Sequence, residues 1–199
     1  MIEKPEIVVL ATRNLGKLQE IREILADWPV EWKSLRDYPA CSEAQETAED
    51  YLSNAREKAA LAAEHSGEWA LADDSGLEVE ALGWKPGVRS ARYAGGGGDE
   101  ANWRKLLTEL QGVPAEKRRA VFRCVVVLRH PDGREQIGRG ELWGSIAEAP
   151  RGEGGFGYDP IFIPEGFDRS LAELSPAEKN SLSHRRRALG QLEVVGEPR

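Results

Sequence analysis

The pattern of hydrophobic and polar positions predicts alternating strands and helices along the chain. The apolar run at residues 6–11 predicts a buried strand, and the apolar positions of residues 18–28 recur at helical spacing. A polar loop joins the two, which gives a strand, loop and helix unit. Helical spacing returns in three later segments, at residues 46–67, 99–112 and 175–192.

Residues typical of helix caps mark the starts of these later helices. Thr47 with Asp50 has the spacing of a cap before the first of them, and Asp99 is expected to cap the second. The third opens with Ser175 and Pro176, and Glu178 completes a capping box. These signals predict where each helix begins.

Two further segments predict strands. Between Arg119 and Ile146, two β-rich runs flank a Pro-Asp-Gly turn sequence, which predicts a long hairpin and hence a mixed sheet. Residues 71–79, LADDSGLEV, place Asp73 and Asp74 in an otherwise apolar, strand-like run. Successive side chains of a strand point to opposite faces, so the two can share a face only if the strand ends there, and the glycine that follows favours such a break. A buried, unpaired carboxylate is costly, so at least one of the two is expected to meet a cation, a metal ion or backbone amides.

Composition narrows the classes of protein. A chain of 199 residues fits a single domain over residues 1–199 that is large enough to bury a substantial core. Acidic residues outnumber basic ones, 34 to 27, and the formal charge of -7 argues against polymeric nucleic acid as a partner. The spacing of Cys41 and Cys124 indicates neither a disulfide framework nor a zinc cluster. The apolar runs are too short to span a membrane, and residues 1–10 lack the pattern of a signal peptide, so a cytoplasmic setting is expected.

Two features suggest an anion site. The loop ATRNLGK, residues 11–17, lies where a strand leads into a helix, where free backbone N–H groups and the helix dipole attract anions, and Lys17 adds a full charge. The loop lacks the first Gly and the Ser or Thr of a Walker motif, so an ordinary polar connection is the alternative. Asn54 and Lys58 share one face of a predicted helix and could reach a common ligand, or could form a solvated surface.

Two further features suggest recognition of a base. In residues 152–164, GEGGFGYDPIFIP, glycines surround Phe156 and Tyr158, either of which could stack on a base, although a tight turn into a core strand would use the same residues. Residues 179–189, KNSLSHRRRAL, form a basic cluster in an acidic protein. Its histidine and arginines are donors suited to a carbonyl oxygen, and the alternative is a solvated helix face.

Six motifs, in one order over residues 7–192, resemble those of the inosine/xanthosine triphosphate pyrophosphatase family: ATRNLGK, SNAREKA, ADDSGLEV, PGVRSARYAG, GGFGYDPIF and AEKNSLSHRRRAL. The resemblance implies a Mg²⁺-dependent hydrolase that acts on an acid anhydride bond. It would convert the deaminated purine nucleotides ITP, dITP and XTP to the nucleoside monophosphate and pyrophosphate, and so keep them out of DNA and RNA. It also implies a homodimer and an α/β fold, with an elongated mixed β-sheet flanked by helices and two lobes with the active-site cleft between them.

The resemblance also assigns roles to individual residues. Asp74 would be the catalytic carboxylate and a metal ligand, with Lys17 and Lys58 as catalytic phosphate lysines. Glu46 is the preferred second metal carboxylate and Glu43 is the fallback. The expected substrate-binding residues are Thr12, Arg13, Asn14, Leu15, Gly16, Lys17, Ser75, Phe156, Gly157, Tyr158, Asp159, Lys179, His184 and Arg185.

On this assignment Asp74 orients or deprotonates the attacking water, and Asp73 points the other way to support the turn. His184 and Arg185 would donate to O6 of hypoxanthine or xanthine, and these donors would stay unpaired against the amino group of adenine. Two alternatives stay open. One is a house-cleaning pyrophosphatase of similar fold for other modified nucleotides, and the other is a nucleotide- or RNA-binding protein without turnover.

Overall fold

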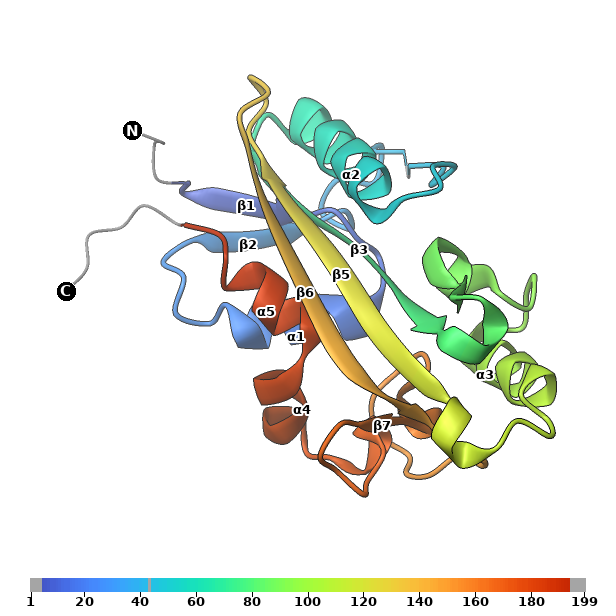
Figure 1. The fold of residues 1–199 in the computed structure, drawn as a ribbon. Coiled ribbons are helices and arrows are strands. Elements are labelled where there is room, and N and C mark those ends of the chain that lie inside the picture. The colour runs from blue at the N-terminus through green and yellow to red at the C-terminus, as the bar shows by residue number, and fades with distance from the viewer. Residues whose placement is uncertain (1–4, 43, 194–199) are drawn as a thin grey trace. The chain divides into compact units, whose positions relative to one another are not determined.

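The computed structural model describes residues 5–42 and 44–193 and has an α/β fold in which helices flank a mixed sheet (Figure 1). The elements in chain order are β1 (Ile7–Leu10), α1 (Leu15–Ile24), β2 (Glu31–Ser34), α2 (Tyr51–Ser66), β3 (Trp69–Val79), β4 (Lys85–Pro86), α3 (Gly98–Glu109), β5 (Arg119–Arg129), β6 (Glu135–Ile146), β7 (Phe162–Pro164), α4 (Pro176–Leu182) and α5 (His184–Leu189). Within the described ranges, no helix is both long and apolar enough to cross a membrane.

The chain divides into two compact units. The first comprises the described residues within 1–74, 124–140 and 185–199, and the second comprises residues 75–123 and 141–184. In the first unit the strand order is β2-β1-β3-β5-β6, with β1 parallel to both β2 and β3. In the second unit the order is β3-β5-β6-β7, with β4 antiparallel to β3 and β7 antiparallel to β6. The predicted mixed sheet is therefore confirmed, and so is the hairpin, because β5 and β6 are neighbours joined through residues 130–134.

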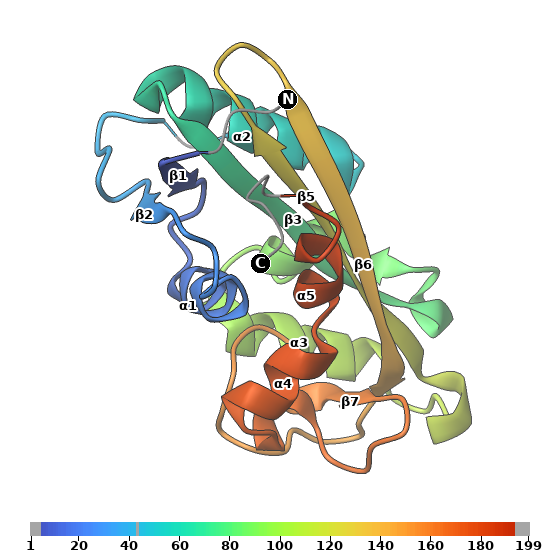
Figure 2. The ribbon, with the colours of Figure 1, turned by 90° about the vertical axis from the view of Figure 1, so that its left-hand side faces the viewer.

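Both faces of the sheet are buried in the first unit. Leu71 of β3 lies in the core cluster that α1 and α5 share with the sheet, and its neighbours Ala70 and Ala72 lie in a second cluster with the alanines of α2. Figure 2 shows α1 and α5 on one side of these strands and α2 on the other. The period of two along β3 therefore decides which helices each side chain meets.

The second unit has its own core. It contains the inner side chains of β3, β5 and β6, together with Leu106 of α3 and Leu110, which follows that helix. Ile161, which precedes β7, and Phe162, its first residue, complete it. Gly76 of β3 packs directly against a backbone turn, because a Cβ placed on it would lie 2.2 Å from the carbonyl oxygen of Gly87. Close packing explains this glycine, and the predicted strand break is wrong, because β3 runs without interruption from Trp69 to Val79.

Three predicted helix starts differ from the structure. α1 begins at Leu15, earlier than expected, because the Asn14 side chain accepts a hydrogen bond from the Lys17 N–H (3.1 Å) and caps the helix there. Asp50, and not Thr47, caps α2 by accepting from the Ser53 N–H. Gly97 is the N-cap of α3, so the side chain of Asp99 does not cap this helix.

The helix predicted over residues 175–192 is two helices. The capping box of Ser175 and Glu178 is present and starts α4, as the sequence indicates. The chain then leaves helical geometry at Ser183, where φ is -50° and ψ is 133°, and α5 starts at the next residue. This break separates Lys179 on α4 from the histidine and arginines on α5.

Candidate functional site

Asp73 and Asp74 follow the alternation of β3 and point to its opposite faces. Asp73 shares its side of the strand with Leu71 and meets α1 and α5, whereas Asp74 shares its side with Ala72 and meets α2. The expectation that the two carboxylates point in opposite directions is confirmed, but no turn separates them. Each carboxylate forms an ion pair with at least one basic side chain, which offsets the cost of burying its charge.

Both oxygens of the Asp74 carboxylate are held by side chains of α2. Asn54 Nδ2 donates to Asp74 Oδ2 at 3.1 Å, and Lys58 Nζ donates to Asp74 Oδ1 at 3.0 Å. Asn54 and Lys58 are one helical turn apart and both contact Asp74, while the common ligand that their spacing suggests stays a prediction. Asn54 also bonds both backbone groups of Ala48, which ties the segment before α2 to the same point. The carboxylate therefore has a fixed orientation.

Lys58 is shared among several acceptors. Its Nζ lies 3.0 Å from Asp74 Oδ1, donates to the backbone oxygen of Asp73 at 3.2 Å, and forms an ion pair with Glu46. Burial lowers the pKa of the Lys58 ammonium, but the charge of Asp74 and then of Asp73 outweighs this, so the pKa is raised overall. At Asp74 burial is the larger effect and raises the pKa of the carboxyl, against the opposing charge of Lys58.

Glu46 reaches this group from an unusual backbone conformation. Its φ of 49° lies in the left-handed region, which is uncommon for a residue other than glycine. Such backbone geometry persists where surrounding contacts hold it, and here the Glu46 carboxylate contacts Lys58. Glu43, the fallback carboxylate, lies outside the described residues.

On the other face of β3, Asp73 belongs to a buried chain of charges. Its Oδ2 lies 3.0 Å from Lys17 Nζ and 3.1 Å from Arg185 Nη2, and Arg185 Nη1 lies 2.8 Å from Oε2 of Glu20. Burial favours the neutral form of Asp73, but the charges of Lys17 and then Arg185 outweigh it and hold the pKa of the carboxyl far below its usual range.

Arg185, which the sequence predicts as a reader of the base, is buried in the first unit. It is only 1% exposed, and its guanidinium is shared between the carboxylates of Asp73 and Glu20. These two ion pairs hold the carboxylates of Asp73 and Glu20, and reading of the base by Arg185 stays a prediction.

The expected phosphate loop forms the turn before α1 and the first turn of that helix. Thr12 Oγ1 accepts from the Asn14 N–H at 3.2 Å, and Arg13 donates to the Cys41 carbonyl at 3.2 Å. Leu15 is 61% exposed and Lys17 is partly exposed at the same helix start. Because the first N–H groups of a helix have no partner within it, this turn can accept an anion.

A second group of predicted residues lies in the second unit. Lys179 Nζ lies 4.3 Å from the ring centroid of Phe156 and 2.5 Å from Asp159 Oδ2. The same carboxylate oxygen accepts from the Phe156 N–H at 2.8 Å. Asp159 therefore fixes both the aromatic ring and the lysine that lies over it.

Two further predicted residues of the second unit are buried. Tyr158 is buried and its hydroxyl donates to the Ser90 carbonyl at 2.8 Å, so its ring is part of the core and not of a stacking surface. His184 is also buried, and its ring is stacked on Phe122 with centroids 4.9 Å apart. Ser75 directly follows Asp74 in β3.

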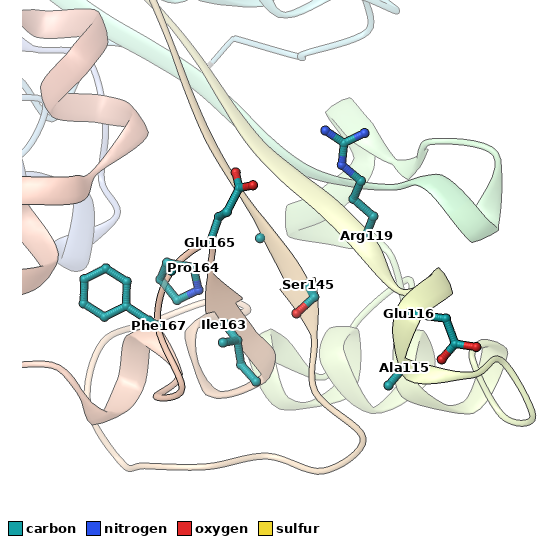
Figure 3. Close-up of a pocket in the computed structure, with 10 residues that line it drawn as sticks. Ala115, Glu116, Arg119, Ser145, Ile163, Pro164, Glu165 and Phe167 are labelled. Carbon is teal, nitrogen blue, oxygen red and sulfur yellow. The ribbon is translucent and has the colours of Figure 1, made fainter.

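The structure also contains a pocket that no predicted site residue lines. It lies in the second unit, has a volume of about 420 Å³, and is formed by residues of β5, β6 and β7 and of the adjoining turns (Figure 3). Arg119, Glu116 and Glu165 are its charged side chains. The lysines and aspartates among the predicted residues form ion pairs within their own units and do not line this cavity.

Sequence reasoning missed Glu20, undervalued Asn54 and assigned Asp99 to a different contact. Glu20 is one helical turn after Lys17, and its burial follows from the apolar positions on either side, Leu18 and Ile21. Asn54 was noticed for its spacing to Lys58, but only the fold shows that Asp74 is the common partner. Asp99 was read as a helix cap, whereas its side chain accepts from the Gly157 N–H at 2.7 Å.

Comparison with known proteins finds close similarity over nearly the whole chain. A model of the Ham1 family matches residues 8–194. The dITP/XTP pyrophosphatase of Geobacter sulfurreducens is 50% identical over 186 residues, which cover 93% of this chain and 94% of that protein. The dITP/XTP pyrophosphatase of Lactiplantibacillus plantarum is 47% identical over 189 residues, covering 95% and 94% of the two chains. The structure of a HAM1 protein from Coxiella burnetii superposes with a TM-score of 0.83 at 40% identity and covers 93% of this chain and 95% of that one.

Proposed function

The chain belongs to the Ham1 family, and from that membership we propose that it is a pyrophosphatase of deaminated purine nucleoside triphosphates. Its substrates are ITP, dITP and XTP, its products are the nucleoside monophosphate and pyrophosphate, and its effect is to keep the deaminated bases out of DNA and RNA. The family expected from the six sequence motifs is confirmed by the match over residues 8–194.

The observation that carries the proposal is the orientation of Asp74. Its two oxygens are held by Asn54 and Lys58 of one helix, and Lys58 also contacts Glu46. A carboxylate held at both oxygens beside an ammonium and a second carboxylate is suited to orienting a water molecule next to phosphates. Lys58 and Lys17 supply positive charge for the phosphate oxygens.

The same residues fit a Mg²⁺ ion. Asp74 and Glu46 both contact the Lys58 ammonium, so the two carboxylates lie close together beside it. In the described part of the chain no group of three or more His, Cys, Asp and Glu side chains could hold a metal, but Mg²⁺ commonly takes one or two carboxylates together with substrate phosphates. When bound, Mg²⁺ supplies positive charge that neutralises the phosphate oxygens.

The protein's part in the reaction is to place and deprotonate water. Asp74 accepts the proton as the water oxygen bonds to the α-phosphorus, and the oxygen that bridged the α- and β-phosphorus leaves with pyrophosphate. The helix start at residues 12–17 and Lys17 bind the departing pyrophosphate, whose negative charge rises as the bond breaks. No covalent bond to the protein is needed.

For the second unit we propose that the purine base binds at the Phe156 ring. Lys179 lies over that ring and Asp159 holds both, so the ring is a preformed stacking surface. His184 is proposed as a donor to O6 of the base. We propose the cytoplasm as the location of the protein. We also propose a homodimer, because the family resemblance implies one.

Release of pyrophosphate tests the proposal. With Mg²⁺ we expect ITP and XTP to be hydrolysed to the monophosphate, with ATP and GTP turned over far more slowly. Asp74→Asn is expected to lower turnover by orders of magnitude, because it removes the base and a metal-binding charge, whereas Asp132→Asn in the β5–β6 turn serves as the matched control. Turnover of ITP by the Asp74 variant at the parent rate would remove Asp74 from the mechanism, and preference for dUTP would favour another class of modified nucleotide.

The position of attack is tested in ¹⁸O-water. Attack at the α-phosphorus places the label in the nucleoside monophosphate and leaves pyrophosphate unlabelled in a single turnover. Label in pyrophosphate would move the attack to the β-phosphorus, and release of orthophosphate would contradict the pyrophosphatase assignment.

A further inference from the structure

The turn that carries Phe156 is held by hydrogen bonds on several sides, all within the second unit. Asp159 accepts from the Phe156 N–H at 2.8 Å, and the Tyr158 hydroxyl donates to the Ser90 carbonyl at 2.8 Å. Between these two anchors lies Gly157, whose φ of 62° is in the left-handed region. Gly157 has no side chain with which to be held, so its orientation depends on its backbone bonds.

Asp99 supplies the bond that holds Gly157. Its Oδ2 accepts from the Gly157 N–H at 2.7 Å, a short distance typical of a hydrogen bond to a carboxylate. Asp99 is available for this bond because α3 is capped by Gly97 and not by Asp99. A residue of the first turn of α3 thus reaches a turn 58 positions later in the chain.

α3 is itself fixed to the segment that holds Tyr158. Asn102 donates to the Ala91 carbonyl at 3.0 Å and accepts from the Ala94 N–H at 2.8 Å. That segment includes Ser90, whose carbonyl accepts from Tyr158. The first turn of α3 and the Phe156 turn are therefore attached to one common framework.

From these contacts we infer that Asp99 is a positioning residue for binding of the purine base. By holding the Gly157 peptide, it keeps the neighbouring Phe156 ring in the place where Lys179 lies over it. The inference rests on the proposed function, because it specifies how the base-binding turn is kept ready. Asp99 acts through the backbone and does not touch the substrate.

The energetic reason lies in the glycines of the turn. Gly154, Gly155 and Gly157 give the backbone more freedom than other residues would, so ordering this turn costs more conformational entropy than ordering a turn without glycines. A bond that orders the turn before the ligand arrives removes part of that cost from binding. Loss of Asp99 should therefore weaken binding of the base and leave binding of the phosphates unchanged.

The experiment compares Asp99→Ala with Asp99→Asn and with Glu100→Ala. The asparagine side-chain oxygen can still accept from Gly157, so it tests rescue. Glu100 is in the same helical turn and its carboxylate pairs with Arg104 on the exposed surface, so its removal controls for the loss of one charge. Melting temperatures of all three are measured first.

The first readout needs no substrate. We expect the Gly157 amide proton, followed by NMR in the free protein, to exchange with solvent about tenfold faster or more in Asp99→Ala, since the hydrogen bond to the Asp99 carboxylate protects it. Exchange in Asp99→Asn and Glu100→Ala should stay near the parent rate. Unchanged exchange in Asp99→Ala would contradict the inference at its first step.

The second readout separates the base from the phosphates. Calorimetry should show inosine monophosphate binding about tenfold more weakly to Asp99→Ala, while inorganic pyrophosphate binds as it does to the parent. In turnover of ITP, KM should rise and kcat should stay near the parent value, and Asp99→Asn should restore KM. Equal weakening of both ligands, or a fall in kcat alone, would overturn the positioning role. If the parent protein itself does not hydrolyse ITP, the proposed function fails, and that result is distinct from either outcome.

Discussion

Arg185 is paired with two buried acids in the first unit, and its loss should therefore be felt in stability. Arg185→Ala would remove one cation from the buried carboxylates of Asp73, which keeps Lys17, and of Glu20. Breaking a buried ion pair by removing one partner costs about 3–5 kcal/mol, so we expect a loss of this size in the free energy of unfolding, measured with urea.

The neighbouring Arg186 provides the control for this prediction. It lies on the same helix and is exposed, so Arg186→Ala should change stability by less than about 0.5 kcal/mol. If Arg185→Ala unfolded at the parent urea concentration and instead lost discrimination between ITP and ATP, the role in reading the base would be supported.

At the scale of single residues, the sequence predicted which face of β3 each aspartate points to, but not which residues each one contacts. The alternation of β3 was enough to place Asp73 and Asp74 on opposite faces, because the period of a strand is fixed by its geometry. Nothing local indicated that Asp73 would meet Lys17 and Arg185, which are distant in sequence from it and from each other. Long-range pairs of charges are decided by the fold and not by spacing along the chain.

At the scale of the elements, the pH dependence of stability tests whether the charge of Glu178 stabilises the start of α4. The pKa of Glu178 is lowered from its ordinary 4.5 to about 2, first by its bond to Arg169 and then by the Ser175 N–H. A carboxyl with a lower pKa in the folded protein stabilises the fold above its unfolded pKa and loses that contribution as pH falls through the folded value. The contribution of Glu178 should therefore be complete above pH about 4.5 and lost as the pH falls to about 2.

Glu178→Gln measures this contribution. The parent protein should melt at a higher temperature than the variant at pH 7, and the difference should shrink as the pH is lowered through the window between the two pKa values. A difference in melting temperature that is the same at both ends of the window would show that the charge of Glu178 does not stabilise the helix start.

Helix starts show why elements were only partly predictable. The box of Ser175 and Glu178 was found correctly because both of its members lie in one turn. α3 was misplaced because Asp99 has the residue type of a cap, whereas a glycine caps the helix and Asp99 bonds Gly157. A capping signal states that a side chain can accept a backbone N–H, but not which one.

For the whole molecule, the three long strands lead us to predict that the two compact units unfold cooperatively. β3, β5 and β6 each contribute residues to both compact units, so neither unit can lose its strands while the other keeps them intact. We expect peptides from both units to become labelled at one urea concentration in pulsed hydrogen exchange with mass spectrometry. Two separate midpoints would instead indicate two domains and would contradict the single domain proposed for residues 1–199.

The overall α/β class and the mixed sheet could be predicted from the sequence because hairpin and strand–helix patterns are local. The split of the last helix at Ser183 could not, since the residues around it keep helical spacing. The cleft expected between two lobes stays a prediction.

The attachment of Asp74 to Asn54 and Lys58 has a consequence for how this lineage can diverge. Because both holders lie on α2, four positions apart, a single inserted or deleted residue between them would rotate one away from the carboxylate. If this pair were lost first, the buried carboxylate would lose the partners that compensate for its burial, so descendants that drift away from catalysis should lose the aspartate before the pair or together with it. In a genealogy of related sequences, an intact pair beside a replaced aspartate would then identify a pseudoenzyme.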